Sequence, residues 1–192
     1  MTERATEKAA VVFSRIAPKV VRVSSLEAAE MVKLLNNTQR DLMFAFANEV
    51  AEICDVTGIS ATEVISAACR DYPRASIALP GPVGGPCLEK DPHILAEGLR
   101  ELNYVPRISL AGRRLNEELP VSSIARLHQA FVTLGNADLT NAKIVILGLA
   151  FKGQPETNDL RGSMAFHILK AARAQWPRAQ YVAYDPIVSY EE

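Results

Sequence analysis

The chain is divided by a stretch rich in glycine and proline, Leu79-Pro80-Gly81-Pro82-Val83-Gly84-Gly85-Pro86-Cys87-Leu88-Glu89-Lys90-Asp91-Pro92. Three glycines and four prolines in fourteen residues exclude a helix interior and a central strand. Glycine reaches backbone angles closed to other residues, while proline fixes its own angle and lacks an N–H donor. The stretch therefore predicts a stiff, closely wound loop that lets a ligand approach bare backbone.

Within this loop, Cys87 is a candidate nucleophile. A thiol reacts as its thiolate, and a neighbouring cation or a helix N-terminus favours that form. Lys90 lies three residues on, and Asp91-Pro92 predicts a helix start with Asp91 as the N-cap and proline at the first helical position. The alternative is a structural turn with a small, inert, buried cysteine. These local features leave both interpretations open.

Composition indicates an ordinary globular protein. The 192 residues are 48% hydrophobic and 22% charged, enough for one large or two small domains with a sizeable core. A net charge of −1 argues against a nucleic-acid or anionic-membrane partner. No apolar run approaches the roughly 20 residues that span a bilayer. Three widely spaced cysteines, with no CxxC pair, make zinc and disulfide frameworks improbable and favour a reducing, cytoplasmic setting; we expect no metal site.

Upstream of the loop, the pattern predicts helices. Residues 1–18 favour a short helix, and Val20 to Val23 favour a strand. Ser24 to Glu27 is a capping-box pattern that opens the longest helical signal, from about Leu26 to Thr57, closed by Gly58. Apolar residues recur on it at helical spacing and predict one broad buried face: Met31, Leu34, Leu35, Leu42, Phe46, Val50 and Ile53.

Lys33 and Asn37 lie four residues apart on that helix and therefore project from one face. A pair of this kind is commonly only a solvated polar stripe, and its residue types alone do not decide between that and a site.

Downstream, the signals stay helical as far as Leu134, with a capping box at Ser60 to Glu63. The expected helices are 60–70, 92–102, 106–118 and 121–134, with Pro120 ending or kinking the last pair. At Gly135 to Asp138 the helical pattern ends, and we expect a domain boundary there. Beyond it, a buried strand at 143–147, a helix at 160–175 and a strand at 180–185 predict one parallel, right-handed βαβ unit.

A second loop, Gly148 to Ser163, joins the first predicted strand to its helix, where α/β sheets usually bind ligands. Lys152 and Arg161 on this loop are candidates to hold phosphate, or else are solvated cations. Gln154 stands where a P-loop would need lysine, which excludes a P-loop nucleotide-triphosphatase. No GxGxxG dinucleotide-binding motif occurs anywhere in the chain.

Taken together, these segments resemble the UDP-sugar 6-dehydrogenase family, from about residue 10 to the end and in the family's order. The segments that carry the resemblance are Glu30 to Asn37, Phe46 to Glu49, Pro80 to Asp91, Asn116-Glu117, and Gly148 to Ser163.

The resemblance implies a mixed fold. Residues 1–23 would be the tail of an NAD-binding Rossmann domain, 24–135 an all-helical central dimerisation domain with the cysteine loop, and 136–192 the first βαβ unit of a Rossmann-like UDP-binding domain. The lack of GxGxxG is then an effect of truncation. We expect most of the NAD site to lie outside these 192 residues, and the chain alone to turn over no substrate.

The resemblance also implies a mechanism. Cys87 would capture the C6 aldehyde of a UDP-sugar as a thiohemiacetal, which oxidation converts to a thioester that water hydrolyses. Lys33 and Asn37 would stabilise the developing oxyanion. Asp91 would position or activate the water.

Further residues are implied to bind the substrate or NAD. Arg74 would reach the substrate of a partner subunit. The remaining substrate contacts would be Gly81, Val83, Gly84, Phe151 and Lys152, and the NAD contacts would be Lys90 and Arg161. Pro86 departs from the usual Ser or His before the cysteine.

The runs Asn37 to Leu42 and Phe46 to Glu49 resemble the N-acetylhexosamine branch of the family more than the UDP-glucose branch. The resemblance thus implies a UDP-N-acetylhexosamine similar to UDP-N-acetylmannosamine, with UDP-glucose as the alternative. The partner would be a second copy of the chain, held through helix 26–57. An alternative of another class is a non-catalytic dimerisation module.

Overall fold

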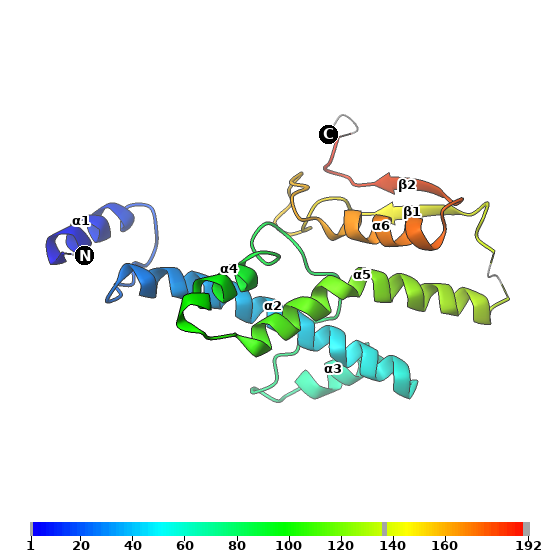
Figure 1. Ribbon diagram of the computed structural model, residues 1–192, viewed down its shortest axis with the longest axis horizontal. Helices are drawn as coiled ribbons and strands as arrows, with labels where there is room; N and C mark the ends of the chain where they lie inside the picture. The colour runs from blue at the N-terminus through cyan, green and yellow to red at the C-terminus, as the bar shows by residue number, and fades with distance from the viewer. Residues whose placement is uncertain (1, 136–137, 190–192) are drawn as a thin grey trace.

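The computed structural model describes residues 2–135 and 138–189 as a helix-rich chain with one small parallel sheet (Figure 1). Its elements are α1 (Glu3–Phe13), α2 (Leu26–Thr57), α3 (Ala61–Cys69), α4 (Asp91–Gly98), the 3₁₀ turn η1 (Arg100–Leu102), α5 (Arg107–Thr133), β1 (Lys143–Leu147), α6 (Met164–Gln175) and β2 (Gln180–Tyr184). No helix among the described residues has the length and apolar character needed to cross a membrane.

The predicted long helix is confirmed as α2. The Oγ of Ser25 caps it by accepting a hydrogen bond from the Ala28 N–H at 3.1 Å, so the cap lies one residue later than the capping-box pattern indicates. Gly58 closes the helix in the left-handed region at a φ of 72°, which costs glycine little.

The predicted buried face of α2 is only partly buried. Met31, Leu34, Leu42 and Val50 are partly buried, whereas Leu35, Phe46 and Ile53 are about half exposed. The fully buried residues are small or polar: Thr38, Asp41, Ala45, Ala47, Asn48 and Cys54. The reason is that α4 and α5 pack on the small and polar side of α2, where Leu42 of the predicted face meets Gly112 of α5.

α5 runs unbroken through Pro120, so the two helices predicted on either side of that proline are one. Proline removes a single backbone hydrogen bond and can be accommodated where packing holds the helix. Pro120 and the preceding Leu119 are both buried. The first half of α5 therefore crosses α2, while its second half reaches α6, and one rigid element links the helical and α/β parts (Figure 1).

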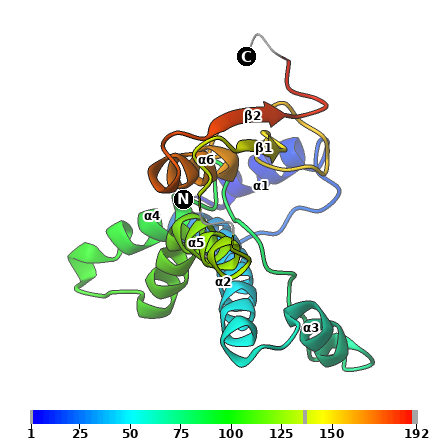
Figure 2. The ribbon, with the colours of Figure 1, turned by 90° about the vertical axis from the view of Figure 1, so that its right-hand side faces the viewer.

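β1 and β2 pair in parallel, with Lys143 opposite Gln180 and Leu147 opposite Tyr184, which confirms the predicted βαβ order. In Figure 2 the two-stranded sheet lies at the top, with α6 beside it and α5 below. Between α5 and α6, Trp176 packs with Ile124 and Ala172 as the core of this part.

β1 is not the buried strand that its sequence predicts. Val145 is 50% exposed and Leu147 77% exposed, because α6 covers one face of the sheet and no described element covers the other. α6 also begins later than predicted, at Met164, where the Ser163 Oγ accepts a hydrogen bond from the Ala165 N–H at 3.3 Å.

The strand predicted at Val20 to Val23 is wrong, because no described strand lies beside it to form a ladder and its residues are largely exposed. α1 has no buried residue and lies apart from the other helices (Figure 1). The predicted domain boundary at Gly135 to Asp138 falls partly on residues 136–137, outside the described residues.

Candidate active site

The glycine–proline loop forms one wall of a cavity of about 430 Å³ between α2 and the loop that follows β1. α2 contributes Asn37, Arg40 and Phe44 to its lining. The remaining lining residues are Pro82 to Leu88, Phe151, Lys152, Gln154 and Pro155. Cys87 is exposed, so its thiol is accessible to a ligand in this space.

Behind this wall, Asp91 gathers three donors. Its Oδ2 accepts hydrogen bonds from Lys33 Nζ at 2.8 Å and from Asn37 Nδ2 at 2.5 Å, and its Oδ1 accepts from Lys90 Nζ at 2.5 Å. The predicted role of Asp91 as N-cap is wrong. Lys90 occupies the cap position without a side-chain cap bond, and Asp91 is the first helical residue of α4 because its carboxylate is taken up by these donors.

These contacts set the charge of the cluster. Burial raises the pKa of Asp91, but hydrogen bonds from Lys33, Lys90 and Asn37 outweigh it and lower that pKa to about 2. The hydrogen bond to Asp91 likewise raises the pKa of Lys33. At neutral pH the cluster is therefore an ionised carboxylate holding two ammonium groups and an amide.

The loop after β1 is fixed by two aspartates. Asp185, just beyond β2, accepts hydrogen bonds from the N–H groups of Leu149 and Ala150 at 2.7 and 3.0 Å, and such backbone bonds lower its pKa. The Phe151 N–H donates to the Asp159 carbonyl at 3.0 Å. Phe151 and Lys152 are thereby held at the cavity, with Lys152 Nζ 5.2 Å from the centre of the Phe151 ring.

Glycines allow the two loops to touch. The Gly85 N–H donates to the Gly162 carbonyl at 2.7 Å, and Gly85 has a φ of 101°. A Cβ on Gly84 would lie 2.3 Å from that same carbonyl oxygen, so a side chain there would push the two segments apart.

Most of the predicted site residues meet here. Six of them line the cavity: Asn37, Val83, Gly84, Cys87, Phe151 and Lys152. Lys33, Lys90 and Asp91 form the adjacent charged cluster.

The other three predicted residues belong neither to the cavity lining nor to the charged cluster. Arg74 lies over the Tyr72 ring, 5.6 Å from its centre. Gly81 is bound on both its N–H and its carbonyl by Asn48. Arg161 is 78% exposed and forms a forked ion pair with Asp159, which lowers the pKa of Asp159 to about 2.

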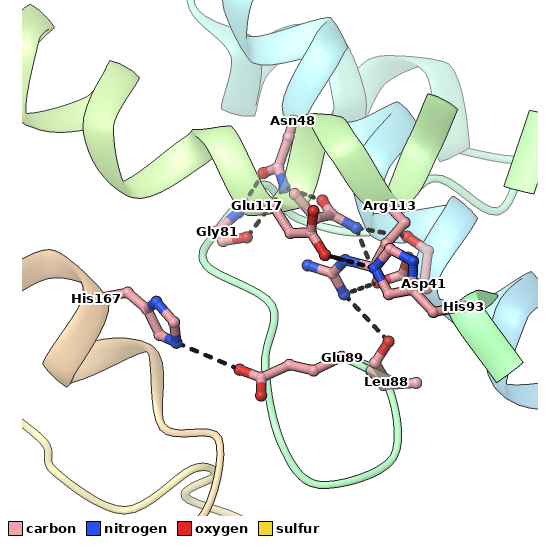
Figure 3. A network of polar contacts seen from close by, with 10 residues as sticks. Asp41, Asn48, Gly81, Leu88, Glu89, His93, Arg113, Glu117 and His167 are labelled. Atoms are coloured by element: carbon pink, nitrogen blue, oxygen red, sulfur yellow. Dashed lines mark hydrogen bonds and ion pairs between the residues drawn. The ribbon is translucent and has the colours of Figure 1, made fainter. Parts of the chain in front are cut away.

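Two groups of site residues were not predicted. Arg40 and Phe44 follow Asn37 by three and seven residues, so helical periodicity would place them on the face of Lys33 and Asn37. The second group is a buried polar network between α2 and α5, Asp41, Asn48, Arg113 and Asn116 (Figure 3). Its partners lie more than 60 residues apart in sequence, so no local pattern indicates that these polar residues are buried together.

The two predicted NAD contacts lie apart from the cavity. Both predicted NAD contacts are already ion-paired, Lys90 with Asp91 and Arg161 with Asp159, and neither lines the cavity. The glycine loop after β1 also lacks the GxGxxG spacing that brings backbone against a pyrophosphate. Within 2–135 and 138–189 we find no cluster of His, Cys, Asp or Glu suited to a metal ion.

An exposed cysteine on the glycine–proline loop therefore shares one cavity with Phe151 and Lys152 of the loop after β1, at the edge of the α/β unit. Residues 27–118 match the model of the UDP-glucose/GDP-mannose dehydrogenase family, central domain. These residues belong to the central domain of that family.

The relatives extend beyond the central domain. The chain is 34% identical to the UDP-N-acetyl-D-mannosamine dehydrogenase of Pyrococcus horikoshii over 98% of its own length, but spans 43% of that protein. It is 34% identical to the UDP-N-acetyl-D-glucosamine 6-dehydrogenase of Pseudomonas aeruginosa, over 89% of the chain and 39% of that protein. The chain thus spans less than half the length of these relatives.

Solved structures confirm the arrangement of the elements. The structure of the Pyrococcus horikoshii UDP-D-ManNAc dehydrogenase superposes on 97% of this chain with a TM-score of 0.83 at 34% identity, using 43% of that protein. A UDP-glucose dehydrogenase from Pyrobaculum islandicum gives a TM-score of 0.79 at 28% identity, over 97% of this chain and 41% of that one.

Proposed function

We propose that this chain is the substrate-binding and covalent-capture part of an NAD-dependent dehydrogenase that oxidises C6 of a UDP-sugar to the uronate. The observation that carries the proposal is that Cys87, Asn37 and Lys152 line one cavity together. Cys87 on the glycine–proline loop would be the nucleophile, and Asn37 on α2 would donate to the oxyanion. Lys152 on the loop after β1 would be a cation for the diphosphate.

At the reacting carbon, the Cys87 Sγ would add to the C6 aldehyde and form a carbon–sulfur bond, while the carbonyl oxygen takes up negative charge. Asn37 lines the cavity on the same helix face as Lys33, and both are donors suited to that oxygen. A proton on the oxygen completes the thiohemiacetal. NAD, when bound, would supply the hydride acceptor for two oxidations: the C6 alcohol to the aldehyde, and the thiohemiacetal to the thioester. Hydrolysis of the later thioester returns Cys87 as the free thiol.

Asp91 acts in this proposal as a positioning residue. Its pKa of about 2 makes it a weak base at neutral pH, and its two oxygens are occupied by Lys33, Asn37 and Lys90. An ionised, buried carboxylate at this place holds the two oxyanion donors in one orientation. The water that hydrolyses the thioester would then be oriented by this cluster rather than deprotonated by Asp91.

The nucleotide end would lie against the loop after β1. Phe151 offers an aromatic face, and Lys152 and Arg40 offer cations from opposite sides of the cavity. Backbone at Gly84, with Val83 beside it, would contact the sugar, while Gly81 is bound to Asn48 and anchors the loop. Lys90, Arg161 and Arg74 stay predicted contacts, the first two to NAD and the third to the substrate of a partner subunit.

The sugar proposed is an N-acetylhexosamine, because relatives named for UDP-N-acetylmannosamine and UDP-N-acetylglucosamine are both 34% identical to the chain. UDP-glucose is the alternative, since a UDP-glucose 6-dehydrogenase of Haloferax volcanii is 31% identical over 98% of the chain.

Cys87→Ala tests the proposal in an enzyme that joins this chain to an NAD-binding half. We expect the unsubstituted enzyme to release two NADH per UDP-sugar, and the variant to form no uronate, because the aldehyde cannot be captured. Cys69→Ala is the matched control and should keep full turnover, since Cys69 does not line the cavity. Uronate formation by Cys87→Ala at the normal rate would refute the covalent role.

We also infer that two copies associate through α2. Leu35, Phe46 and Ile53 recur at spacings of eleven and seven residues, which places them on one helix face, and each is about half exposed. The chain exposes 13803 Å², whereas a compact monomer of its length exposes about 9000 Å². A second copy packed against Leu35, Phe46 and Ile53 would bury part of this additional exposed surface.

Phe46→Glu is expected to convert a dimer to a monomer in sedimentation experiments at micromolar concentration, because a charge would be buried in the contact. Val121→Glu, an equally apolar and exposed position on α5, should leave the dimer intact. A monomer before any substitution would rule out this association, and with it the non-catalytic dimerisation module.

A further inference from the structure

The buried polar network between α2 and α5 touches the glycine–proline loop on both sides of Cys87 (Figure 3). On the N-terminal side, Asn48 Oδ1 accepts from the Gly81 N–H at 2.7 Å, and Asn48 Nδ2 donates to the Gly81 carbonyl at 3.1 Å. On the C-terminal side, an Arg113 terminal nitrogen donates to the carbonyl of Leu88, the residue after Cys87, at 3.1 Å. The loop is therefore held at Gly81, six residues before Cys87, and at Leu88, one residue after it.

The two holding points belong to one unit. Asn48 Nδ2 also donates to Asn116 Oδ1 at 3.0 Å, and Asn116 Nδ2 donates to the Asp41 carbonyl and carboxylate at 2.9 and 3.0 Å. The carboxylate oxygen Oδ1 of Asp41, which accepts from Asn116, also accepts a hydrogen bond from an Arg113 terminal nitrogen at 2.7 Å. All four side chains are buried to within about 1% of full burial.

Stabilising the helix pair does not by itself require this arrangement. A buried ion pair can often be replaced by apolar residues without loss of stability, because desolvation offsets much of its attraction. Here the guanidinium and the amide use part of their hydrogen-bonding capacity on the loop backbone rather than on the helices. Apolar residues in place of Arg113 and Asn48 could not make these hydrogen bonds to the loop.

We propose that Arg113 and Asn48 are positioning residues that hold the Cys87 loop, with Asp41 and Asn116 fixing them in turn. The inference rests on the proposed role of Cys87, and it assigns to the α2–α5 network the task of keeping the thiol at the cavity beside Asn37. Glu117 supports Arg113 from the outside, with Oε1 at 3.3 Å from Arg113 Nε and at 2.8 Å from His93 Nε2.

Two amides report on the loop without bonding to any network residue. The Gly85 N–H donates to the Gly162 carbonyl at 2.7 Å, and the Asp91 N–H donates to the Cys87 carbonyl at 3.0 Å. The Gln180 N–H, bonded to the Ala142 carbonyl at 2.9 Å, is a remote reference. Hydrogen exchange at these three amides, measured by NMR on the 192-residue chain, separates loop opening from global unfolding.

The decisive variant is the double substitution Asp41→Leu with Arg113→Met. Arg113→Met alone would leave the Asp41 carboxylate buried without its cation, and we expect it to lower the midpoint of thermal unfolding. The double variant removes both buried charges, so its midpoint should largely recover. The Leu88 carbonyl stays without its donor, so exchange at Gly85 and Asp91 should remain at least about tenfold faster than in the unsubstituted chain, the factor expected for one lost charged hydrogen bond. Exchange at Gln180 should be unchanged.

Arg114→Met is the matched control, because Arg114 is the exposed neighbour on the same helix, and it should alter none of the three rates. Asn48→Ala tests the other holding point without burying a charge, and should also accelerate Gly85 and Asp91 while leaving Gln180 unchanged. This variant decides the matter if the double variant does not fold.

If loop exchange returns to the normal rate together with stability, or if all three amides accelerate equally, the network serves only the helix pair and the inference is wrong. No substrate is present in these measurements. Full activity of Cys87→Ala would therefore remove the proposed function and leave the exchange result standing.

Discussion

Asp91 is fully buried, yet it is ionised and satisfied by three donors, which makes it the charge centre of the site. Its pKa of about 2 lies below the ordinary value of 3.8. The folded state therefore binds this proton less readily than the unfolded state. The stabilisation is fully present above about pH 4 and is lost as the pH falls toward 2.

Asp91→Asn should test this linkage. The amide keeps the shape of the side chain but removes a charged acceptor, so we expect the free energy of unfolding at pH 7 to fall by about 2 kcal/mol. The gap between the two proteins should shrink between pH 4 and pH 2, because the unsubstituted protein must then protonate Asp91. Urea unfolding at several pH values measures the gap, with Glu101→Gln, an exposed carboxyl, as the control. A gap independent of pH would contradict this account.

At the same scale, local chemistry predicted part of the site. Cys87 in its loop and the i, i+4 pair Lys33 and Asn37 are visible as candidates in a few residues, but only the resemblance to the UDP-sugar 6-dehydrogenase family assigns them catalytic roles. The role of Asp91 was misjudged as a cap because its donors Lys33 and Asn37 lie 58 and 54 residues away. Side chains from distant segments decide what a carboxylate does, and no local pattern contains them.

At the scale of elements, caps and glycines predicted where helices begin and end, but not which faces are covered. The bounds of α2 agree with prediction, since Gly58 and the serines before Leu26 act locally. Three residues of its predicted buried face, Leu35, Phe46 and Ile53, stay about half exposed, because a hydrophobic pattern indicates which side chains avoid water but not which element covers them. Asn48 is buried instead, since Asn116 satisfies it from α5.

The crossing of α2 and α5 depends on Gly112. A Cβ built there would lie 2.5 Å from Leu42 Cδ2 and 3.3 Å from Ala45 Cβ, so the Leu42 side chain would have to move and the two helices would be crowded at this point. Overpacking costs about 2 kcal/mol, and the better helix propensity of alanine returns about 1 kcal/mol. We therefore expect Gly112→Ala to lower the free energy of unfolding by about 1 kcal/mol.

Gly98→Ala is the matched comparison. Gly98 is also helical, at the end of α4, and a Cβ there meets no heavy atom within 4 Å. We expect a gain of about 0.5 kcal/mol from reduced freedom of the unfolded chain. Urea unfolding of both variants gives the comparison. Two changes of the same sign would show that the α2–α5 approach does not limit the size of residue 112.

At the scale of the whole molecule, the helical part and the α/β part are joined by α5 and by the contact between the two loops. The βαβ unit could be predicted from its own strands, but its dependence on the glycine–proline loop could not. That dependence arises from backbone meeting backbone, where Gly85 donates to Gly162. In the sequence such a contact is indicated only by a glycine, and a glycine needed for a close backbone contact cannot be told from one needed for a turn.

Gly84→Ala should open this contact. The added Cβ would lie 2.3 Å from the Gly162 carbonyl oxygen and 2.8 Å from Met164 Cγ, and a backbone atom cannot yield as a side-chain tip can. We expect the contact to lose about 2 kcal/mol, seen as faster hydrogen exchange at the Gly85 amide with α2 amides unchanged. The cavity would lose its fixed wall, since Cys87 and Phe151 lie on its two sides.

Gly81→Ala provides the control within the same loop, because a Cβ there meets no heavy atom within 4 Å and its bonds to Asn48 use only backbone atoms. Its Gly85 amide should exchange at the normal rate. Equal effects of the two substitutions would mean that loop flexibility, rather than the approach of Gly84 to Gly162, governs the junction. An effect of Gly84→Ala alone would establish that the two parts of the molecule are held in register by a contact only glycine permits.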